Sequence, residues 1–432
     1  SGASQTGFGR TGTVDWQTGS IKTGNFTAAN GEGYFCDTSS GTFTATLPSS
    51  PSAGDIVAFA DYTRTFGTNK LTIGRNSQPI GGIANNAELT VNGQSATFVY
   101  VDGTEGWINI NETQTSATGL PPYIGATGGT VTECGDYKIH TFTGPGTFAV
   151  SRLALCSADD KVDYLVVGGG GGGGGTNCTS AGAGGAGGLR FYANTPTNPQ
   201  AANPSNPINN FPSGTTITAT VSSFPITVGS GGAGGPNATD GPTLGTNGNV
   251  STFSTVTSAG GGAGHGYKGG QPLNGNPGAS GGAGSYGGSG GTGNTPPTSP
   301  AQGTNGGAGD NSPQLGGGGG GAIAAGTTAS GSTTGNGGAG AGFTGFGASN
   351  GQCSSCKQYF AGGGGGGSDS AFPSGGTGGL GGGGTGGRDS TGTAGTANTG
   401  GGGGGGQNSG SVGPMVGRAG GSGIVVIRYR FQ

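Results

Sequence analysis

The sequence predicts a mainly β and irregular fold: a small N-terminal all-β domain, then a polyglycine II helix sandwich closed by a small β layer, with little or no α-helix. Glycine supplies 114 of the 432 residues. Its tracts keep a register of three, as at Pro277, Ser280, Ala283, Tyr286, Ser289 and Thr292. Elsewhere, short apolar or alternating segments separated by turn residues have the pattern of strands. No segment has the spacing of an amphipathic helix.

The register of three is the repeat of the left-handed polyproline II helix. Glycine on the other two faces lets neighbouring backbones approach closely. Such a helix makes no internal hydrogen bonds, so its buried peptide groups must pair with neighbouring helices. The chain therefore needs many of them side by side. The glycine-rich segments are residues 168–175, 182–188, 229–235, 260–264, 281–291, 315–321, 335–342, 362–367, 375–387, 400–406 and 417–423.

Linker-like disorder and collagen are the alternatives to a packed bundle. A flexible linker has no reason to keep a register, and disordered chains are usually rich in charge, whereas charged residues are only 8% here. Collagen needs glycine at every third position without a break, and abundant proline. Here glycine commonly fills two positions of three, and prolines number 22. We therefore favour the bundle over disorder and reject collagen.

Four segments follow one another along the chain. Residues 1–20 are polar and glycine-rich and are expected to form a neck. Residues 21–111 are expected to form an all-β module, residues 112–130 a polar linker, and residues 131–432 the glycine-rich domain. The strands expected in the all-β module are residues 33–37, 42–47, 55–60, 70–73, 88–91, 96–101 and 106–110.

The glycine-rich domain is expected to begin and end in strands. Residues 136–142, 147–155 and 162–167 open it, and the apolar run 423–431 ends it. We expect the last strand to close back on the opening strands, so that the domain starts and finishes in one small β layer. Apolar side chains there supply hydrophobic burial, about 25 cal/mol per Å², that a glycine lattice lacks.

Cys134 and Cys156 flank an expected hairpin over residues 137–152, which turns at Gly144-Pro145-Gly146. In that hairpin the two cysteines face each other. A disulfide between them is therefore plausible and would contribute about 3 kcal/mol.

The remaining cysteines carry weaker signals. Cys353 and Cys356 have CxxC spacing, but without a second pair at zinc spacing this is a weak metal signal. A small disulfide loop or two free thiols is the preferred interpretation, so we expect no metal site. Cys36 and Cys178 have no obvious partner.

Composition argues against several classes of function. The net charge is −3 and no basic stripe is visible, whereas phosphate binders show one, so nucleic acid is not expected as a partner. No stretch approaches the roughly 20 apolar residues of a membrane span, so membrane insertion is not expected. Matches to GxGxxG occur throughout, but no helix follows them, and a dinucleotide site needs one. No cofactor is expected.

Candidate catalytic groups are few. His140 lies in an expected strand, where a packed role is the simplest, and His265 lies in a glycine loop, where it could contact a ligand. No nucleophile, base and acid can be assembled from sequence neighbours. The acidic residues 159–163 fit no calcium loop and are interpreted as solvated turn residues. We therefore expect a protein that is not an enzyme.

Four features of the second half resemble a known family. The apolar residues 164–167 run into the tract 168–175, and residues 396–399 run into the tract 400–406. The Gly-Gly-X register lies between them, and residues 420–429 end in an apolar strand. Together these features resemble the glycine-rich domain of bacteriophage tail-fibre proteins, common in phages of cyanobacteria and other marine bacteria. More distantly, they are similar to the tip adhesins of T-even-like phages.

This resemblance covers about residues 131–432. A shorter match, within residues 54–107, resembles a β module of phage fibre and appendage proteins. In that family the bundle is a rigid, protease-resistant scaffold, and loops at its tip contact a host outer-membrane protein or surface polysaccharide. The resemblance implies an extracellular adhesin of the virion tail fibre that binds without catalysis.

Loops that carry aromatic rings are the candidates for receptor contact, because rings stack on sugars and dominate small interfaces. Each could instead pack internally, and for Phe343 and Phe346 packing between helices is equally expected. The candidates are Tyr192, Phe211, His265, Tyr267, Phe343, Phe346, Tyr359 and Phe360.

Other partners and two rival functions remain open. Other fibre proteins of the virion are expected partners, and the all-β module could form a homotrimer, because closing on partners protects exposed strand edges. The first rival is a self-assembling filament or virion appendage that binds no receptor. The second is an ice-binding protein, like the polyglycine II antifreeze protein of snow fleas, although aromatic and proline-rich loops argue against it.

Overall fold

The computed structural model describes residues 14–111, 123–154, 156–176, 180–193, 216–236, 243–266, 271–312, 314–346, 350–368, 374–388, 392–407 and 416–431. The chain divides into an N-terminal unit, Ser1–Pro122, and a glycine-rich unit, Tyr123–Phe431. Both are built of strands and irregular segments, and the described residues include a single 3-10 turn, Ser157–Asp160. The predicted mainly β and irregular fold is confirmed.

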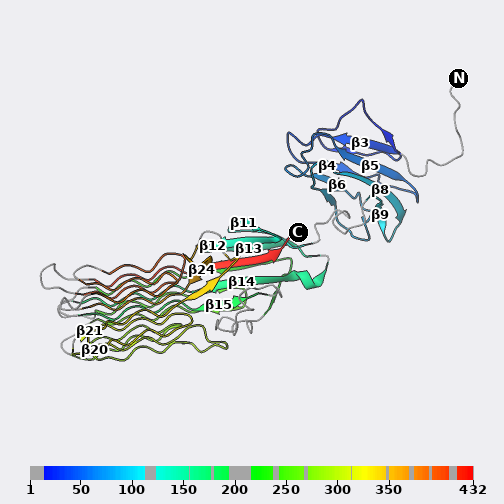
Figure 1. Cartoon of the computed structure of the whole chain (residues 1–432). Helices are drawn as coiled ribbons and strands as arrows, with labels where there is room; N and C mark the ends of the chain where they lie inside the picture. Colours follow the sequence, from blue (N-terminus) through cyan, green and yellow to red (C-terminus); the bar gives the residue numbers. More distant parts are fainter. Residues whose placement is uncertain are drawn as a thin grey trace, which may run out of the picture. The chain divides into compact units, whose positions relative to one another are not determined.

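The N-terminal unit is a sandwich of two sheets (Figure 1). One sheet has the order β1 (Asp15–Trp16), β3 (Glu32–Cys36), β5 (Ile56–Asp61), β8 (Ser95–Asp102) and β9 (Gly106–Asn109). The other has the order β2 (Phe26–Thr27), β4 (Phe43–Thr46), β6 (Leu71–Gly74) and β7 (Ala87–Leu89). Their inner faces share one core, in which Phe59 and Trp107 of the first sheet meet Leu71 of the second.

The seven strands expected in this unit all form, within two residues of the predicted bounds. The predicted neck does not end where expected, because Asp15 and Trp16 pair in parallel with Glu32 and Gly33. Burial explains the difference: Trp16 lies over Gly33, where a side chain on Gly33 would meet the indole ring at 2.8 Å. The Trp16 ring packs on the bare backbone of Gly33, and this contact holds residues 15–16 in the sheet.

Two further sheets form the β layer of the glycine-rich unit. The first has the order β11 (Thr130–Cys134), β12 (Tyr137–Phe142), β25 (Ile424–Arg430), β14 (Lys161–Val167) and β15 (Leu189–Tyr192), with β16 (Ile217–Thr218) also on β14. The second has the order β10 (Gly125–Thr127), β13 (Gly146–Arg152), β17 (Ser223–Thr227), β18 (Ser251–Phe253) and β19 (Val256–Ser258). Residues 125–130, expected in a linker, therefore belong to these sheets.

The last strand closes the unit as predicted, because β25 lies between β12 and β14 and pairs with both. Its side chains alternate between two cores: Ile424 and Val426 point into one, and Val425 and Ile427 into the other. A strand covered on both faces is a continuous apolar run. This explains the unbroken Ile-Val-Val-Ile sequence.

The predicted hairpin over residues 137–152 is wrong. β12 and β13 belong to different sheets, so Gly144-Pro145-Gly146 carries the chain from one sheet to the other. β12 pairs instead with β11, through a tight turn in which Gly135 has a φ of +55°. A local partner with a favourable turn occupies one edge of β12, and β25 occupies the other.

Glycine tract 168–175 shows how the bundle is held together. Its N–H groups point in three directions, and each direction recurs every third residue. They donate to carbonyls of three segments at 2.8–3.0 Å: residues 182–188, 243–249 and 418–421. Its carbonyls accept from three more segments at 2.8–3.0 Å: residues 261–264, 232–235 and 403–406. Six neighbours therefore surround one three-fold helix, which is the predicted polyglycine II packing.

The interior of this lattice has no room for large side chains, although alanines such as Ala183 and Ala186 are fully buried in it. A Cβ atom added to any glycine of tract 168–175 would lie 1.9–2.4 Å from a backbone atom of a neighbouring segment. Tracts 316–321 and 362–367 have six neighbours in the same way. Uninterrupted glycine marks helices in which every face meets backbone, whereas residues 182–188 also have six neighbours and accommodate two buried alanines.

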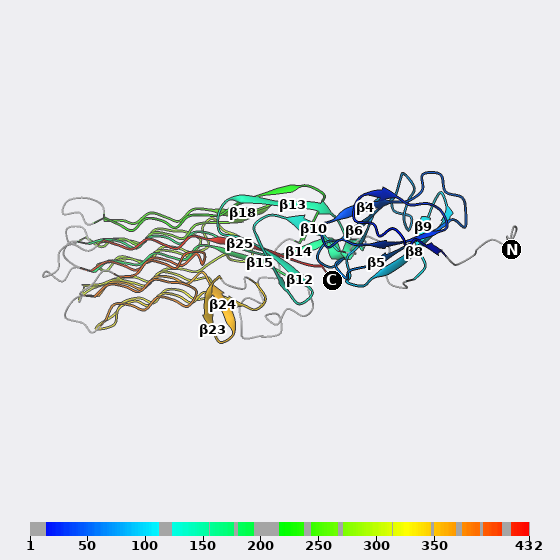
Figure 2. The same cartoon turned by 90° about the horizontal axis from the view of Figure 1, so that it is seen from above.

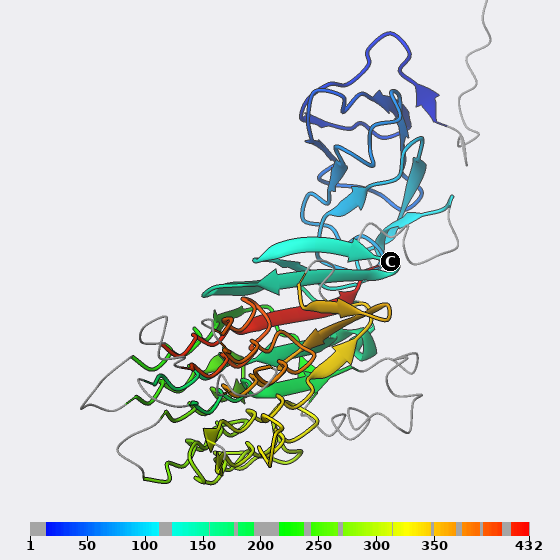
Figure 3. The ribbon, with the colours of Figure 1, turned by 60° about the vertical axis from the view of Figure 1, so that its left-hand side comes forward.

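The helices run back and forth between the β layer and the opposite end of the unit, and they leave the strands side by side (Figure 3). Two predicted segments each contain two helices, since 281–291 turns at Tyr286–Gly287 and 375–387 turns at Gly381–Gly382, all with positive φ. The prediction also missed outer helices with less glycine, such as residues 243–249 and 303–309. Their signal is glycine at every third position, as at Gly245 and Gly248.

Asparagine and threonine side chains satisfy backbone groups on the outer faces of the bundle. Asn247 Oδ1 accepts the Ala263 N–H at 2.8 Å, and Asn336 Oδ1 accepts the Thr377 N–H at 2.8 Å. Thr246 Oγ1 accepts from Ala233 at 2.7 Å in the same way. Their side-chain oxygens accept backbone N–H groups that a carbonyl of a neighbouring helix accepts in the interior.

Replacing one interior glycine by alanine tests the packed lattice. A Cβ on Gly403 would lie 2.0 Å from the Arg418 carbonyl oxygen, and neighbours on every side prevent relaxation. Gly403→Ala should lower the free energy of unfolding by about 3 kcal/mol, as overpacking does, and Gly403→Val by more. Thermal melting and protease resistance measure the effect.

Gly144→Ala is the matched control, because nothing lies within 4 Å of a Cβ at that position. It should change stability by no more than about 0.5 kcal/mol. If Gly403→Ala melts and resists protease like the control, the backbone-to-backbone packing is refuted.

Candidate functional site

The bundle has two chemically different ends (Figure 2). One end is the β layer. At the other, here called the distal end, the helices reverse direction, as in the Tyr286–Gly287 turn, the Ser330–Thr333 bridge and the hairpin of β20 (Asp310–Asn311) and β21 (Gln314–Leu315). Because the β layer ties down the opposite end, the distal end is where the glycine-rich unit offers connections of variable chemistry.

A layer of buried polar side chains marks the distal end. Each of its members stands at the end of a helix and is at most 1% exposed. Ser285, for example, donates from its hydroxyl to the Gly266 carbonyl at 2.9 Å. The layer consists of Thr176, Ser180, Thr243, Ser285, Ser368 and Gln407. Buried polar side chains therefore end the lattice here, whereas the β-layer end combines apolar cores with buried polar residues such as Ser251, Ser258 and Gln302.

Of the described candidates for receptor contact, His265 alone lies at the distal end. Its ring is half-buried, with Nδ1 3.1 Å from the Gly266 carbonyl oxygen. Tyr286, which the sequence placed on the glycine register, is also half-buried there, in a turn. Phe211 and Tyr267 lie outside the described residues.

The other aromatic candidates belong to the β layer. Phe343, Phe346 and Phe360 are buried in one apolar core, so the prediction that they contact a receptor is wrong and the packing alternative holds. Tyr192 stacks on a neighbouring tyrosine ring at 6.0 Å, and the Tyr359 ring covers Gly342. Glycine lattices offer a ring nothing to pack against, so rings gather where sheets supply side chains.

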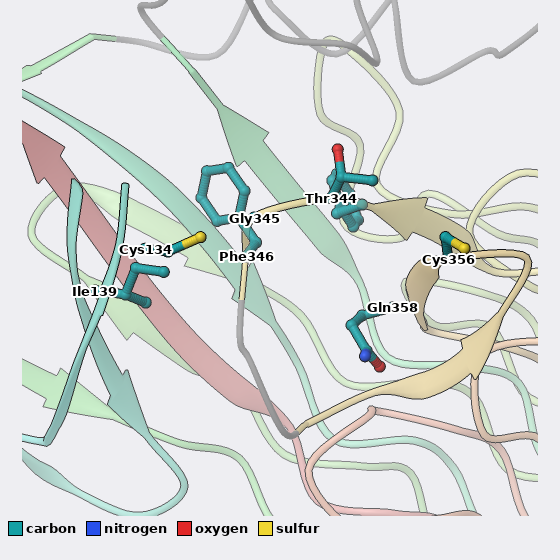
Figure 4. A pocket seen from close by; sticks show the side chains of 8 residues that line it. Cys134, Ile139, Thr344, Gly345, Phe346, Cys356 and Gln358 are labelled. Atoms are coloured by element: carbon teal, nitrogen blue, oxygen red, sulfur yellow. The ribbon is translucent and has the colours of Figure 1, made fainter. Parts of the chain in front are cut away.

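These buried rings border a small hollow of about 200 Å³. It lies between β11–β12 and the sheet of β22 (Ala341–Phe343), β24 (Lys357–Phe360) and β23 (Gln352–Ser354) (Figure 4). Its lining residues are Cys134, Ile139, Phe343, Thr344, Gly345, Phe346, Cys356 and Gln358. The lining holds no charged group, so the hollow suits a small apolar group.

Arg428 fixes one wall of this hollow. Its guanidinium lies 4.2 Å from the Phe346 ring centroid and 4.5 Å from that of Tyr137. It also donates to Asp163 Oδ2 at 2.6 Å, and the Asp163 side chain is only 4% exposed. A buried ion pair flanked by two rings is well suited to hold the segment 343–346 against β25.

The structure holds these cysteines as free thiols, which contradicts the Cys134–Cys156 disulfide and agrees with the free-thiol alternative for Cys353 and Cys356. Cys134 and Cys156 do not face each other, since their flanking strands belong to different sheets. Cys353 lies in β23 and Cys356 in the turn that follows, where its φ is +59°. Cys36 is buried, and burial raises the pKa of its thiol to about 12.

His140 is a buried structural residue. Its Nδ1 donates to the Gly128 carbonyl at 2.7 Å, and its Nε2 accepts from the Tyr429 hydroxyl at 3.1 Å. Nδ1 carries the proton, because a carbonyl only accepts. Burial lowers the pKa of His140 and raises that of Tyr429 to about 12. Both groups therefore resist taking a charge.

The part of the chain that the structure describes shows neither a metal cluster nor a membrane-spanning helix. Within the described ranges, no three His, Cys, Asp or Glu side chains cluster closely enough to hold a metal ion. Of the helices in that part of the chain, none has the length and apolar character needed to cross a bilayer.

Comparison with known proteins agrees with the glycine-rich architecture. A family model described as a glycine-rich domain matches residues 141–430, which is more than half of the chain. No curated protein sequence matches the chain.

Thiol counting tests the free cysteines. Cys134, Cys156, Cys353 and Cys356 are exposed and Cys36 is buried. In a Cys178→Ser variant, purified without reductant, a disulfide-exchange reagent should react with these four exposed thiols in the native chain. The fifth should react only after unfolding, because its high pKa leaves little thiolate. Finding two fewer thiols in the native chain would establish a disulfide that the structure lacks.

Burial of His140 predicts a loss of stability in mild acid. The unfolded state binds a proton near pH 6.5, whereas the folded state, with its lowered pKa, resists it. Stability is therefore complete above about pH 6.5 and falls as the pH drops below it. Urea unfolding between about pH 7 and 5.5 should show this loss, and His140→Gln should reduce it.

His265→Gln is the control, because His265 is the only other histidine and its ring is half-buried. That variant should keep the pH dependence of the parent. If His140→Gln keeps the pH dependence of the parent, His140 is not the group responsible for the loss of stability in mild acid.

Proposed function

Because the chain belongs to the glycine-rich domain family, we propose that it is a phage tail-fibre or appendage protein whose glycine-rich unit attaches the virion to the host cell surface. Contact is made by the connections at the distal end. One observation carries this proposal: the lattice has no room for large side chains in its interior, while the half-buried His265 and Tyr286 stand among the turns of the distal end. Such an end is a binding surface that can vary without disturbing the scaffold.

Rigidity supports the same function. Backbone hydrogen bonds hold each interior helix on six sides, so connections at the distal end are presented on a fixed frame. A preorganised binding surface loses less conformational entropy on contact. The ligand is a surface protein or polysaccharide of the host, bound without covalent chemistry and outside the cell.

The filament alternative has less support. Lateral growth of a polyglycine lattice requires free N–H and C=O groups on its outer faces. Where Asn247, Asn336 and Thr246 accept those N–H groups from adjacent helices, a further chain finds no donor. Such caps act as edge protection does in β-sheets, and they favour a discrete unit.

Binding to cells tests the proposal. The labelled, folded chain should bind particular strains in a panel of bacteria that includes cyanobacteria, saturably and in competition with phage adsorption. Tyr286→Gly removes the ring at a turn position where φ is +51°, which glycine tolerates. Combined with His265→Ala, it should weaken binding about tenfold or more, as loss of an interface anchor does.

Lys357→Ala is the control, because Lys357 lies in β24 at the β layer and is not fully buried. It should bind like the parent. If the folded chain binds no strain, or if Lys357→Ala weakens binding while the distal variant does not, attachment through the distal end is refuted.

A further inference from the structure

The two sheets of the N-terminal unit present opposite chemistry on their outer faces. The outer positions of β4, β6 and β7 are Thr44, Thr46, Thr72 and Glu88, since the residues between them point into the core. This is the usual pattern of a sheet that packs on the core with one face and is exposed to solvent on the other. The outer face of the other sheet is apolar, although it belongs to the same sandwich.

The strand registers bring apolar side chains together on that face. Val99 lies opposite Ile56 on one side and opposite Ile108 on the other. Phe35 lies opposite Ala60. We call the set Trp16, Phe35, Tyr62, Val99, Ile108 and Ile110 the apolar sheet face.

Three aromatic rings continue along one edge of the apolar sheet face. The Trp16 and Phe35 centroids are 5.0 Å apart, and those of Phe35 and Tyr62 are 6.3 Å apart. Three members of the face are exposed, Trp16 at 37%, Tyr62 at 57% and Ile110 at 55%, and Phe35, Val99 and Ile108 between them are half-buried. A contiguous exposed apolar patch on a soluble domain marks an interaction surface.

The sequence of the middle strand points to the same conclusion. β5 begins Ile-Val-Ala-Phe-Ala, an unbroken apolar run. Val57 and Phe59 fill the inner core, whereas Ile56 and Ala58 point to the opposite face, where neighbouring residues of the unit leave them only 4% and 1% exposed. Strands that read as continuous apolar runs are those covered on both faces. In the glycine-rich unit, β25 has such a run and is covered in this way.

We propose that the apolar sheet face associates with the same face of further copies of this chain. The face carries no charged side chain, so its partner must be apolar and uncharged as well, and the face itself meets that requirement. Self-complementary patches are the basis of symmetric homo-oligomers. A glycan is the alternative occupant, since Trp16, Tyr62, Ser95 and Thr97 offer hydrogen-bonding groups beside the rings, and the quenching experiment below distinguishes it from self-association.

The glycine-rich unit offers no equal partner among its described residues. Its large exposed apolar side chains are single valines on four separate segments: Val131, Val221, Val250 and Val416. Five strands about 4.8 Å apart give a face about 20 Å across, which is modest for a stable interface of roughly 800 Å² per partner. Copies joined by this face are therefore expected to separate on dilution.

Sedimentation of the full chain from dilute to concentrated solution tests the proposal. The parent should form a small closed oligomer that dissociates on dilution. The double variant Val99→Thr, Ile108→Thr gives this face the threonine chemistry of the other sheet and should be monomeric throughout. Val91→Thr is the matched control, because Val91 is 61% exposed and lies outside the apolar sheet face. It should associate like the parent.

Tryptophan quenching decides the matter on the unmodified chain, even if the double variant fails to fold. The chain has two tryptophans. Trp107 is fully buried, so iodide reaches only Trp16. Quenching should weaken as concentration rises and copies cover Trp16. A chain that stays monomeric with Trp16 quenched at every concentration overturns the proposal, as does a monomer whose Trp16 is shielded by an added polysaccharide.

Discussion

Hydrogen bonding between backbones of different helices is the constraint on which the glycine-rich unit depends. A polyglycine II helix satisfies none of its own peptide groups, and each glycine loses more conformational entropy on folding than any other residue. A net gain of about 1 kcal/mol per hydrogen bond stabilises such a helix only when all of its sides are occupied. Tract 168–175 meets this condition with six neighbours. The bundle is therefore stable as a whole or not at all, and its outer helices need caps such as Asn247 and Asn336.

The same constraint sorts the side chains of the unit by place. Close backbone contact excludes large side chains from the interior, so they collect at the two ends and on the outer faces. Apolar and aromatic side chains gather at the β layer, where β14 and β25 are covered on both faces. Polar ones, such as Ser285 and Gln407, end the helices at the distal end.

The sequence predicted the bundle and the closing strand because both depend on local pattern: a register of three in one case and an unbroken apolar run in the other. It could not place the aromatic loops. Helices alternate in direction, so the end at which a loop lies depends on how many helices precede it. A prediction that omits the helix of residues 243–249 places each later loop at the opposite end of the bundle, and this includes the loop that carries His265. The hairpin prediction failed for a related reason, since β12 had better partners in β11 and β25.

The proposed association through the N-terminal unit and the proposed attachment through the glycine-rich unit would reinforce each other. Contacts made by a few loops at the distal end give limited affinity, because the lattice contributes no side chains to them. Copies joined at the apolar sheet face present several distal ends at once, and the second contact then forms at a high effective concentration. Linked sites gain about 10² to 10⁴ in avidity without any new contact. An uncovered apolar face on one unit thus compensates for the sparse side chains of the other.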